Sequence, residues 1–225
     1  VTHYTDKLFR IKLERPRDYR FTAGEFTMIG LPEEKVRRAY SFTSGPYDDY
    51  LEFYSIKVPN GPLTSKLKYI EPGKFLAVSD KPTGTLTLAN LELGGHLWLM
   101  ATGTGIAPYI SLLRDPNTFD AFDKITVCWT VSNKKDLRSY NEFLEENDVT
   151  YFPTVTREEF KNQGRITKYI DGGMWDDITP SNDKIMICGS LEFNKEMKER
   201  LVAKGFEEGN KRTAGTFTLE KAFVG

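Results

Sequence analysis

The feature that most constrains the fold is a change of sequence pattern near residue 94. Before this point, short segments such as Leu8–Leu13 and Leu51–Val58 alternate apolar and polar residues, with Gly and Pro between them. After it, His96–Ala101 is a continuous apolar run, followed by a glycine-rich turn and a helical pattern. Alternation is typical of half-buried strands, whereas continuous apolar runs are typical of strands buried on both faces. A chain with both patterns is predicted to form two domains.

The first pattern predicts a small antiparallel β-barrel over residues 1–93. Further short strands are expected at Phe26–Ile29 and Phe75–Val78, each close to a Gly or Pro. Repeated short strands with turn residues between them favour a closed antiparallel sheet.

The second pattern predicts an α/β domain with a parallel sheet over residues 94–225. Strand, glycine-rich turn and helix follow one another, which is typical of an open parallel sheet covered by helices. The expected strands after the first are Lys124–Trp129, Val149–Val155 and Ile185–Cys188. The expected helices are Pro108–Arg114, Leu137–Glu146 and Glu192–Lys204.

Composition excludes several classes of function. The 31 basic and 32 acidic residues nearly cancel, which argues against general nucleic-acid binding. Two Cys and two His are too few for a disulfide framework, an iron–sulfur cluster or a four-cysteine zinc site, so no metal is expected. No apolar run approaches the roughly 20 residues that span a bilayer, and residues 1–4 lack a signal-peptide pattern. We therefore expect a cytoplasmic monomer that does not bind membranes.

The stretch Arg38-Ala39-Tyr40-Ser41 contains the residue types that a flavin site needs. An arginine pairs bidentately with a pyrophosphate, and a tyrosine offers an aromatic face for stacking. The Ser41 hydroxyl is suited to a hydrogen bond with flavin N5. Taken alone, however, the stretch is better explained as an exposed turn with a surface arginine.

A second candidate phosphate site is Gly61-Pro62-Leu63-Thr64-Ser65, which opens a helix expected at Ser65–Tyr69. Unpaired N–H groups at a helix start bind phosphate readily. Thr64 or Ser65 as an ordinary helix N-cap is the alternative, and capping and phosphate binding can coexist.

Two small-residue clusters follow buried strands of the second domain. Gly103-Thr104-Gly105 precedes a helix, so a ligand phosphate can approach its backbone closely, although the spacing is not G-x-G-x-x-G. Cys188-Gly189-Ser190 leaves room for a ligand ring at the carboxyl edge of the sheet. Cys188 is suited to contact with a nicotinamide, but a cysteine in a strand is more often a small core residue.

In this order, the motifs resemble those of the ferredoxin–NADP reductase family, and most closely its bacterial ferredoxin/flavodoxin–NADP reductases. The resemblance covers essentially the whole chain. Further matching segments are Lys81–Gly84, Val155–Glu158, Gln163–Thr167 and Ala222–Val224.

The resemblance implies that the barrel binds FAD and that the α/β domain binds NADP(H). It implies a flavin site of Arg38, Ala39, Tyr40, Ser41, Tyr54, Ser55, Ile56, Lys57, Leu63, Thr64, Ser65, Thr104, Ala222 and Phe223. It implies an NADP site of Gly103, Gly105, Arg157, Arg165, Cys188, Gly189 and Ser190. Ser41, Cys188 and Phe223 are the implied catalytic residues, and the C-terminal tail would cover the flavin as a gate.

The implied reaction takes hydride from NADPH and passes single electrons to ferredoxin or flavodoxin. Arg157 and Arg165 match the family's arginines for the adenosine 2′-phosphate. Relatives often carry another arginine near Ser132, where this chain has Lys134 and Lys135 instead. The alternatives are the reductase component of an oxygenase, a free-flavin reductase, or a non-catalytic subunit that FAD anchors in a complex.

Overall fold

A computed structural model describes residues 1–222, which divide into two compact units. Unit 1 contains residues 1–84 and 107–115, and unit 2 contains residues 85–106 and 116–222. Unit 1 thus includes one helix that lies beyond residue 94.

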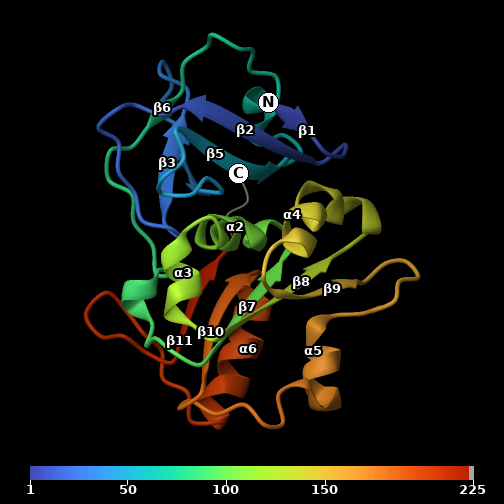
Figure 1. Cartoon of the computed structure of the whole chain (residues 1–225). Coiled ribbons are helices and arrows are strands. Elements are labelled where there is room, and N and C mark those ends of the chain that lie inside the picture. The colour runs from blue at the N-terminus through green and yellow to red at the C-terminus, as the bar shows by residue number, and fades with distance from the viewer. Residues whose placement is uncertain (223–225) are drawn as a thin grey trace. The chain divides into compact units, whose positions relative to one another are not determined.

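Unit 1 is built from two antiparallel sheets of three strands each, in the orders β1-β2-β5 and β4-β3-β6 (Figure 1). Side chains from both sheets and from helix α1 share one hydrophobic core, so the expectation of a small antiparallel barrel is confirmed. The elements are β1 (Thr2–His3), β2 (Leu8–Glu14), β3 (Phe26–Gly30), β4 (Arg38–Ser41), β5 (Tyr50–Ile56), α1 (Thr64–Leu67), β6 (Ala77–Val78) and α2 (Ala107–Leu113).

A buried carboxylate ties α2 to the strands of unit 1. Glu52, in β5, accepts hydrogen bonds from the Thr43 hydroxyl at 2.9 Å and from Arg114 at 3.1 Å. Arg10 of β2 pairs with its other oxygen at 3.2 Å. Removing one partner from such a buried network leaves an uncompensated charge, so these groups hold the barrel and the helix together.

Unit 2 is a parallel sheet of five strands in the order β11-β10-β7-β8-β9, which confirms the predicted α/β fold (Figure 1). The strands are β7 (His96–Thr102), β8 (Lys124–Val131), β9 (Thr150–Val155), β10 (Asp183–Gly189) and β11 (Phe217–Lys221). The sequence pattern did not predict β11, because its residues are partly polar and its neighbouring strand is far away in the chain.

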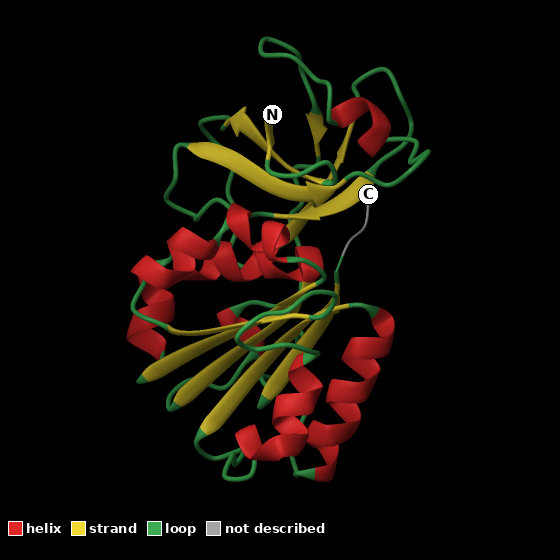
Figure 2. Cartoon of the chain, turned by 90° about the vertical axis from the view of Figure 1, so that its right-hand side faces the viewer, coloured by secondary structure: helices red, strands yellow, loops and turns green. Residues whose placement is uncertain are grey.

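Helices α5 (Ile166–Tyr169) and α6 (Leu191–Ala203) pack their apolar side chains against one face of this sheet (Figure 2). The other α-helices of unit 2 are α3 (Pro116–Ala121) and α4 (Asn141–Glu146). The single helix expected over Leu137–Glu146 is wrong. A 3₁₀ helix, Lys134–Ser139, ends at Tyr140, whose φ of −139° is not helical, and α4 begins after it.

Within residues 1–222, no helix has the length and apolar character needed to cross a bilayer. The same residues contain no group of three or more His, Cys, Asp or Glu side chains arranged to hold a metal ion.

Candidate functional site

The stretch Arg38–Ser41 forms the whole of strand β4, so its interpretation as an exposed turn is wrong. It pairs antiparallel with β3, with Tyr40 opposite Thr27. Tyr40 and Ser41 are buried, whereas Arg38 is partly exposed. Within residues 1–222, the Arg38 guanidinium donates only to the Arg37 carbonyl oxygen, at 2.9 Å, and thus keeps most of its donors for a ligand.

Tyr40 carries a buried hydroxyl that is not fully used by the protein. The residue is 4% exposed, and within residues 1–222 its Oη has no hydrogen-bond partner of regular geometry. Burial raises the pKa of Tyr40, and the nearby Ser55 hydroxyl and Arg38 offset part of that rise. Because an unpaired buried hydroxyl costs free energy, its presence favours a ligand that completes the site.

Strand β5 supplies the next group of expected flavin residues. Tyr54 and Ser55 are buried, Ile56 is partly exposed at the strand end, and Lys57 follows it. Tyr4 packs edge-on against Tyr54, with ring centroids 6.2 Å apart. The structure therefore brings the residues of β4 and β5 into the same unit, as a shared flavin site requires.

The segment after β5 presents two backbone donors at the start of α1. The N-cap residue of α1 is Leu63, so the predicted N-cap at Thr64 or Ser65 is wrong. The Thr64 hydroxyl instead accepts a hydrogen bond from the Val58 N–H at 3.2 Å. Within residues 1–222, the N–H groups of Leu63 and Thr64 donate to no acceptor. Unpaired amides at a helix start suit a phosphate oxygen.

These features fit the FAD that the resemblance implies. A buried aromatic residue with an unpaired hydroxyl, an available guanidinium and two unpaired amides match a flat polar-edged ring with a pyrophosphate attached. Tyr40 and Leu63 belong to one core cluster, so these groups are fixed on the same body.

In unit 2, β7 is followed by a 3₁₀ helix, Gly103–Ile106, and the two glycines of this turn have different surroundings. Gly103 has φ of +54°, and no atom lies within 4 Å of the position that a Cβ would take. A Cβ on Gly105, in contrast, would overlap the carbonyl oxygen of Cys188. Gly105 is therefore needed for close packing against β10, whereas Gly103 leaves open space beside the loop.

Cys188 and Glu220 lie opposite each other on β10 and β11. Burial raises the pKa of the Cys188 thiol well above its usual value, and the charge of Glu220 adds to this. The thiol is therefore protonated at neutral pH, which leaves it a contact surface rather than a nucleophile.

Glu220, opposite Cys188, has a covered carboxyl group that the sequence interpretation missed. Burial raises the pKa of its carboxyl group to about 7, while Thr85 donates to Oε2 through its N–H at 3.0 Å and its hydroxyl at 3.3 Å. Its other oxygen, Oε1, is buried and has no hydrogen-bond partner within residues 1–222. The signal was a lone acidic residue in the Phe217–Lys221 run just before the tail, but that run was not identified as a strand.

The residues around Cys188 have structural tasks of their own. A Cβ on Gly189 would overlap side-chain atoms of Thr102 and Phe193. The Ser190 hydroxyl caps α6 by accepting from the Phe193 N–H at 3.2 Å. Ala222 donates its N–H to the Gly189 carbonyl at 2.8 Å, which fixes the start of the tail in unit 2. Phe223, the other predicted tail residue, lies outside the described residues.

Arg157 and Arg165 are both exposed, and within residues 1–222 neither guanidinium makes an ion pair or hydrogen bond. Arg157 lies just after β9, where its N–H donates to the Ser132 carbonyl at 3.0 Å. Arg165 is the N-cap residue of α5. Two uncommitted guanidinium groups suit a phosphate dianion, which the arginine fork binds bidentately.

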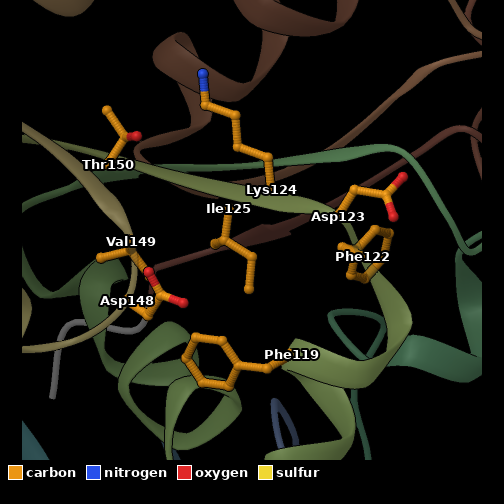
Figure 3. Close-up of a pocket in the computed structure, with 8 residues that line it drawn as sticks. All are labelled: Phe119, Phe122, Asp123, Lys124, Ile125, Asp148, Val149 and Thr150. Atoms are coloured by element: carbon orange, nitrogen blue, oxygen red, sulfur yellow. The ribbon is translucent and has the colours of Figure 1, made fainter.

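A hollow of about 290 Å³ lies at the other edge of the sheet, where β8 and β9 begin. Figure 3 shows Phe119 and Ile125 turned toward each other across it, while Lys124 extends away. None of the predicted site residues lines this hollow. Ligands of open α/β sheets bind at the carboxyl ends of the strands, so the loop at Gly103–Gly105 is the better candidate for a nucleotide site.

Comparisons with known proteins identify the family of the chain. A family model described as "Oxidoreductase NAD-binding domain" matches residues 99–199. The chain is 42% identical to ferredoxin–NADP reductase A of Sorangium cellulosum, over 100% of this chain and 88% of that protein. It is also 42% identical to a flavodoxin/ferredoxin–NADP reductase of Rhodobacter capsulatus, over 100% of this chain and 91% of that protein.

Among solved structures, a ferredoxin NADP⁺ reductase from Neisseria gonorrhoeae with bound FAD and NADP superposes with a TM-score of 0.91. It is 29% identical, and the match covers 99% of this chain and 95% of that one.

Proposed function

Because the chain belongs to the ferredoxin–NADP reductase family, we propose that it uses FAD to exchange electrons between NADPH and ferredoxin or flavodoxin. Bound FAD would supply a ring that accepts a hydride and releases electrons one at a time. The chain's own task is to hold the ring and the nucleotide in alignment and to exclude competing reactions.

In unit 1, we assign the ring face to Tyr40 and the ring edge to the Ser41 hydroxyl. Arg38 and the amides of Leu63 and Thr64 would bind the pyrophosphate. The remaining expected contacts come from β5 and the residues next to it, which are Tyr54, Ser55, Ile56, Lys57 and Ser65. Thr104, Ala222 and Phe223 complete the expected set from outside unit 1's strands.

In unit 2, we assign the adenosine 2′-phosphate to Arg157 and Arg165. The loop of Gly103 and Gly105 and the cluster of Cys188, Gly189 and Ser190 would receive the nicotinamide half. Cys188 would act through contact, because its thiol stays protonated. We propose residues 1–93 and 94–225 as the FAD-binding and NADP-binding domains, respectively.

The observation that carries the proposal is the unpaired donor set of unit 1. Within residues 1–222, the buried Tyr40 Oη has no hydrogen-bond partner of regular geometry, and the N–H groups of Leu63 and Thr64 donate to no acceptor. Tyr40 and Leu63 nevertheless belong to one hydrophobic core. A barrel that served only as a scaffold would gain by satisfying these groups or replacing them with apolar ones.

Anaerobic stopped-flow spectroscopy tests the proposal directly. The purified chain, supplied with FAD, should be yellow. Its flavin absorbance should decrease much faster on mixing with NADPH than on mixing with NADH. The reduced protein should then reduce ferredoxin or flavodoxin. A colourless protein that does not take up FAD would contradict the proposal, and bound FAD that no pyridine nucleotide bleaches would favour a non-catalytic subunit.

The choice of acceptor needs its own measurement. Comparable rates with free flavin and with the carrier proteins would favour a free-flavin reductase over the function proposed. We also propose that the protein acts as a monomer in the cytoplasm, and sedimentation of the FAD-loaded chain tests the first of these statements.

A further inference from the structure

The loops that follow β8 and β9 are hydrogen-bonded to each other beyond the ends of the two strands. The Arg157 N–H donates to the Ser132 carbonyl oxygen at 3.0 Å. Further along both loops, a carboxylate oxygen of Glu158 accepts a hydrogen bond from the Lys134 N–H. The two loops therefore lie side by side at the carboxyl ends of parallel strands, which is where open α/β sheets bind ligands.

A third segment is joined to the same place through Val155, the last residue of β9. The Val155 carbonyl oxygen accepts a hydrogen bond from the Gly164 N–H at 2.8 Å. Arg165 directly follows Gly164, and Arg157 lies two residues after Val155. Hydrogen bonds therefore hold together the segments that carry Arg157, Arg165 and Lys134.

The ammonium group of Lys134 is not used by the protein. The residue is exposed, and within residues 1–222 its Nζ makes no ion pair or hydrogen bond. Glu158 binds Lys134 through the backbone N–H and not through the ammonium group. Asp136, in the same loop as Lys134, likewise accepts from a backbone group, the Asn133 N–H, at 3.1 Å. The cation is therefore available to an anionic ligand.

We propose that Lys134 is a specificity-determining residue for NADP(H), whose ammonium group binds the adenosine 2′-phosphate together with Arg157 and Arg165. The inference rests on the function proposed above, which assigns this phosphate to the two arginines. A phosphate monoester carries nearly two negative charges and three acceptor oxygens. Glu158, next to Arg157, repels such a group, and Lys134 is a cation placed to offset that repulsion.

The simpler explanation is that Lys134 is an ordinary solvated surface lysine, in which case it should behave like Lys135 beside it. Both are exposed and belong to the 3₁₀ helix Lys134–Ser139. Successive side chains of such a helix point about 120° apart, because a turn has three residues. Lys134 is bound to the loop of Arg157, so Lys135 faces another direction and provides a matched control.

The first experiment measures the affinity of the FAD-loaded full chain for adenosine 2′,5′-bisphosphate by calorimetric titration. In Lys134→Ala, loss of one charged contact should weaken binding about tenfold. Lys134→Arg should retain most of the affinity, and Lys135→Ala should bind like the unsubstituted chain. Because the contact is exposed to solvent, the effect of Lys134→Ala should decrease at high salt.

The second experiment compares steady-state kinetics with NADPH and with NADH, which lacks the 2′-phosphate. In Lys134→Ala, kcat/KM for NADPH should fall about tenfold through a higher KM, with kcat unchanged, because the contact is the same in the ground state and the transition state. The value of kcat/KM for NADH should not change. Thermal stability should also stay the same, since the side chain is exposed.

The outcomes separate this inference from the proposed function. Unchanged affinity for the bisphosphate in Lys134→Ala, an equal loss in Lys135→Ala, or an equal fall of kcat/KM for NADH overturns the role of Lys134. An unsubstituted chain that neither binds the bisphosphate nor prefers NADPH to NADH overturns the proposed function itself.

Discussion

The expected cofactor residues of the two units differ in how deeply the protein covers them. In unit 1, the side chains assigned to the flavin ring, Tyr40, Ser41, Tyr54 and Ser55, are buried members of strands. In unit 2, the groups assigned to the 2′-phosphate, Arg157 and Arg165, are exposed and unpaired within residues 1–222. A resident cofactor suits a site built into a core, whereas a nucleotide that must leave after each turnover suits exposed groups.

The two units also differ in net charge. Counted along the sequence, unit 1 has 15 Lys and Arg against 12 Asp and Glu, and unit 2 has 16 against 20. Unit 2 therefore carries a net negative charge, although it is the unit assigned to an anionic nucleotide. Its overall field cannot attract NADPH, so local arginines have to do so.

The largest expected effect is that of Arg157→Ala combined with Arg165→Ala. Each charged contact to the 2′-phosphate contributes about 1.5–3 kcal/mol, so the preference for NADPH over NADH should fall by roughly 100-fold or more. FAD content and thermal stability should not change, because both side chains are exposed. Steady-state kcat/KM for NADPH and NADH measures the preference.

Lys204→Ala is the control for this variant, since it removes an exposed cation at the end of α6. It should leave the preference intact. Unchanged selectivity in the double arginine variant would refute the assignment and remove the contrast between an enclosed and an exposed site.

The second-largest expected effect is that of a substitution at Gly105, which packs closely against β10 in unit 2. A methyl group in Gly105→Ala would overlap the Cys188 carbonyl, and overpacking against the backbone costs about 3 kcal/mol. We expect a lower melting temperature of unit 2 and loss of NADP⁺ binding, with FAD still bound. Calorimetric unfolding and nucleotide titration measure both.

Gly103→Ala is the matched control in the same loop. Its Cβ meets no atom within 4 Å, so only the positive φ is penalised, by about 1 kcal/mol. Equal effects of the two substitutions would show that backbone conformation, and not the close approach to β10, makes glycine necessary here.

The sequence predicted the two fold patterns and the motifs, but not the way in which individual residues are used. Periodicity was sufficient for the barrel and for the parallel strands β7 to β10, since burial on one or both faces leaves a pattern of period two or a continuous run. It missed the short strands β1 and β4 of the barrel. It did not show that Gly105 serves packing, that Ser190 caps a helix, or that Glu220 is covered. These roles depend on contacts with backbone or side-chain atoms from segments that are distant in the sequence. A local sequence pattern does not predict such contacts.

The third expected effect uses Glu220, a buried carboxyl group in unit 2. Its folded pKa of about 7 lies above its ordinary value of 4.5, so the folded state holds the proton more tightly. The resulting stabilisation is complete below pH 4.5 and is lost as the pH rises to about 7, at most about 2–3 kcal/mol. Glu220→Gln should remove this pH dependence and be the more stable protein at pH 8.

Urea unfolding of both proteins at pH 5 and pH 8 checks this sign. Glu192→Gln, which replaces an exposed carboxylate on α6, should follow the unsubstituted chain at both values. If the free energy of unfolding changes with pH in the same way for Glu220→Gln and for the unsubstituted chain, the Glu220 carboxyl group is solvated in the folded protein.

The smallest expected effect, that of Tyr40→Phe, tests whether unit 1 is built around a cofactor. Without FAD, the variant should be as stable or more stable by less than about 1 kcal/mol, because a buried unpaired hydroxyl is removed. With FAD, it should release the cofactor several-fold more readily.

Tyr19→Phe is the control. The Tyr19 hydroxyl donates to the Ser79 carbonyl at 2.7 Å, so its loss should cost about 1 kcal/mol with or without FAD and leave FAD affinity unchanged. If Tyr40→Phe instead lowers the stability of the FAD-free protein and retains FAD fully, the hydroxyl serves the barrel, and the contrast between the two units reduces to a difference in burial.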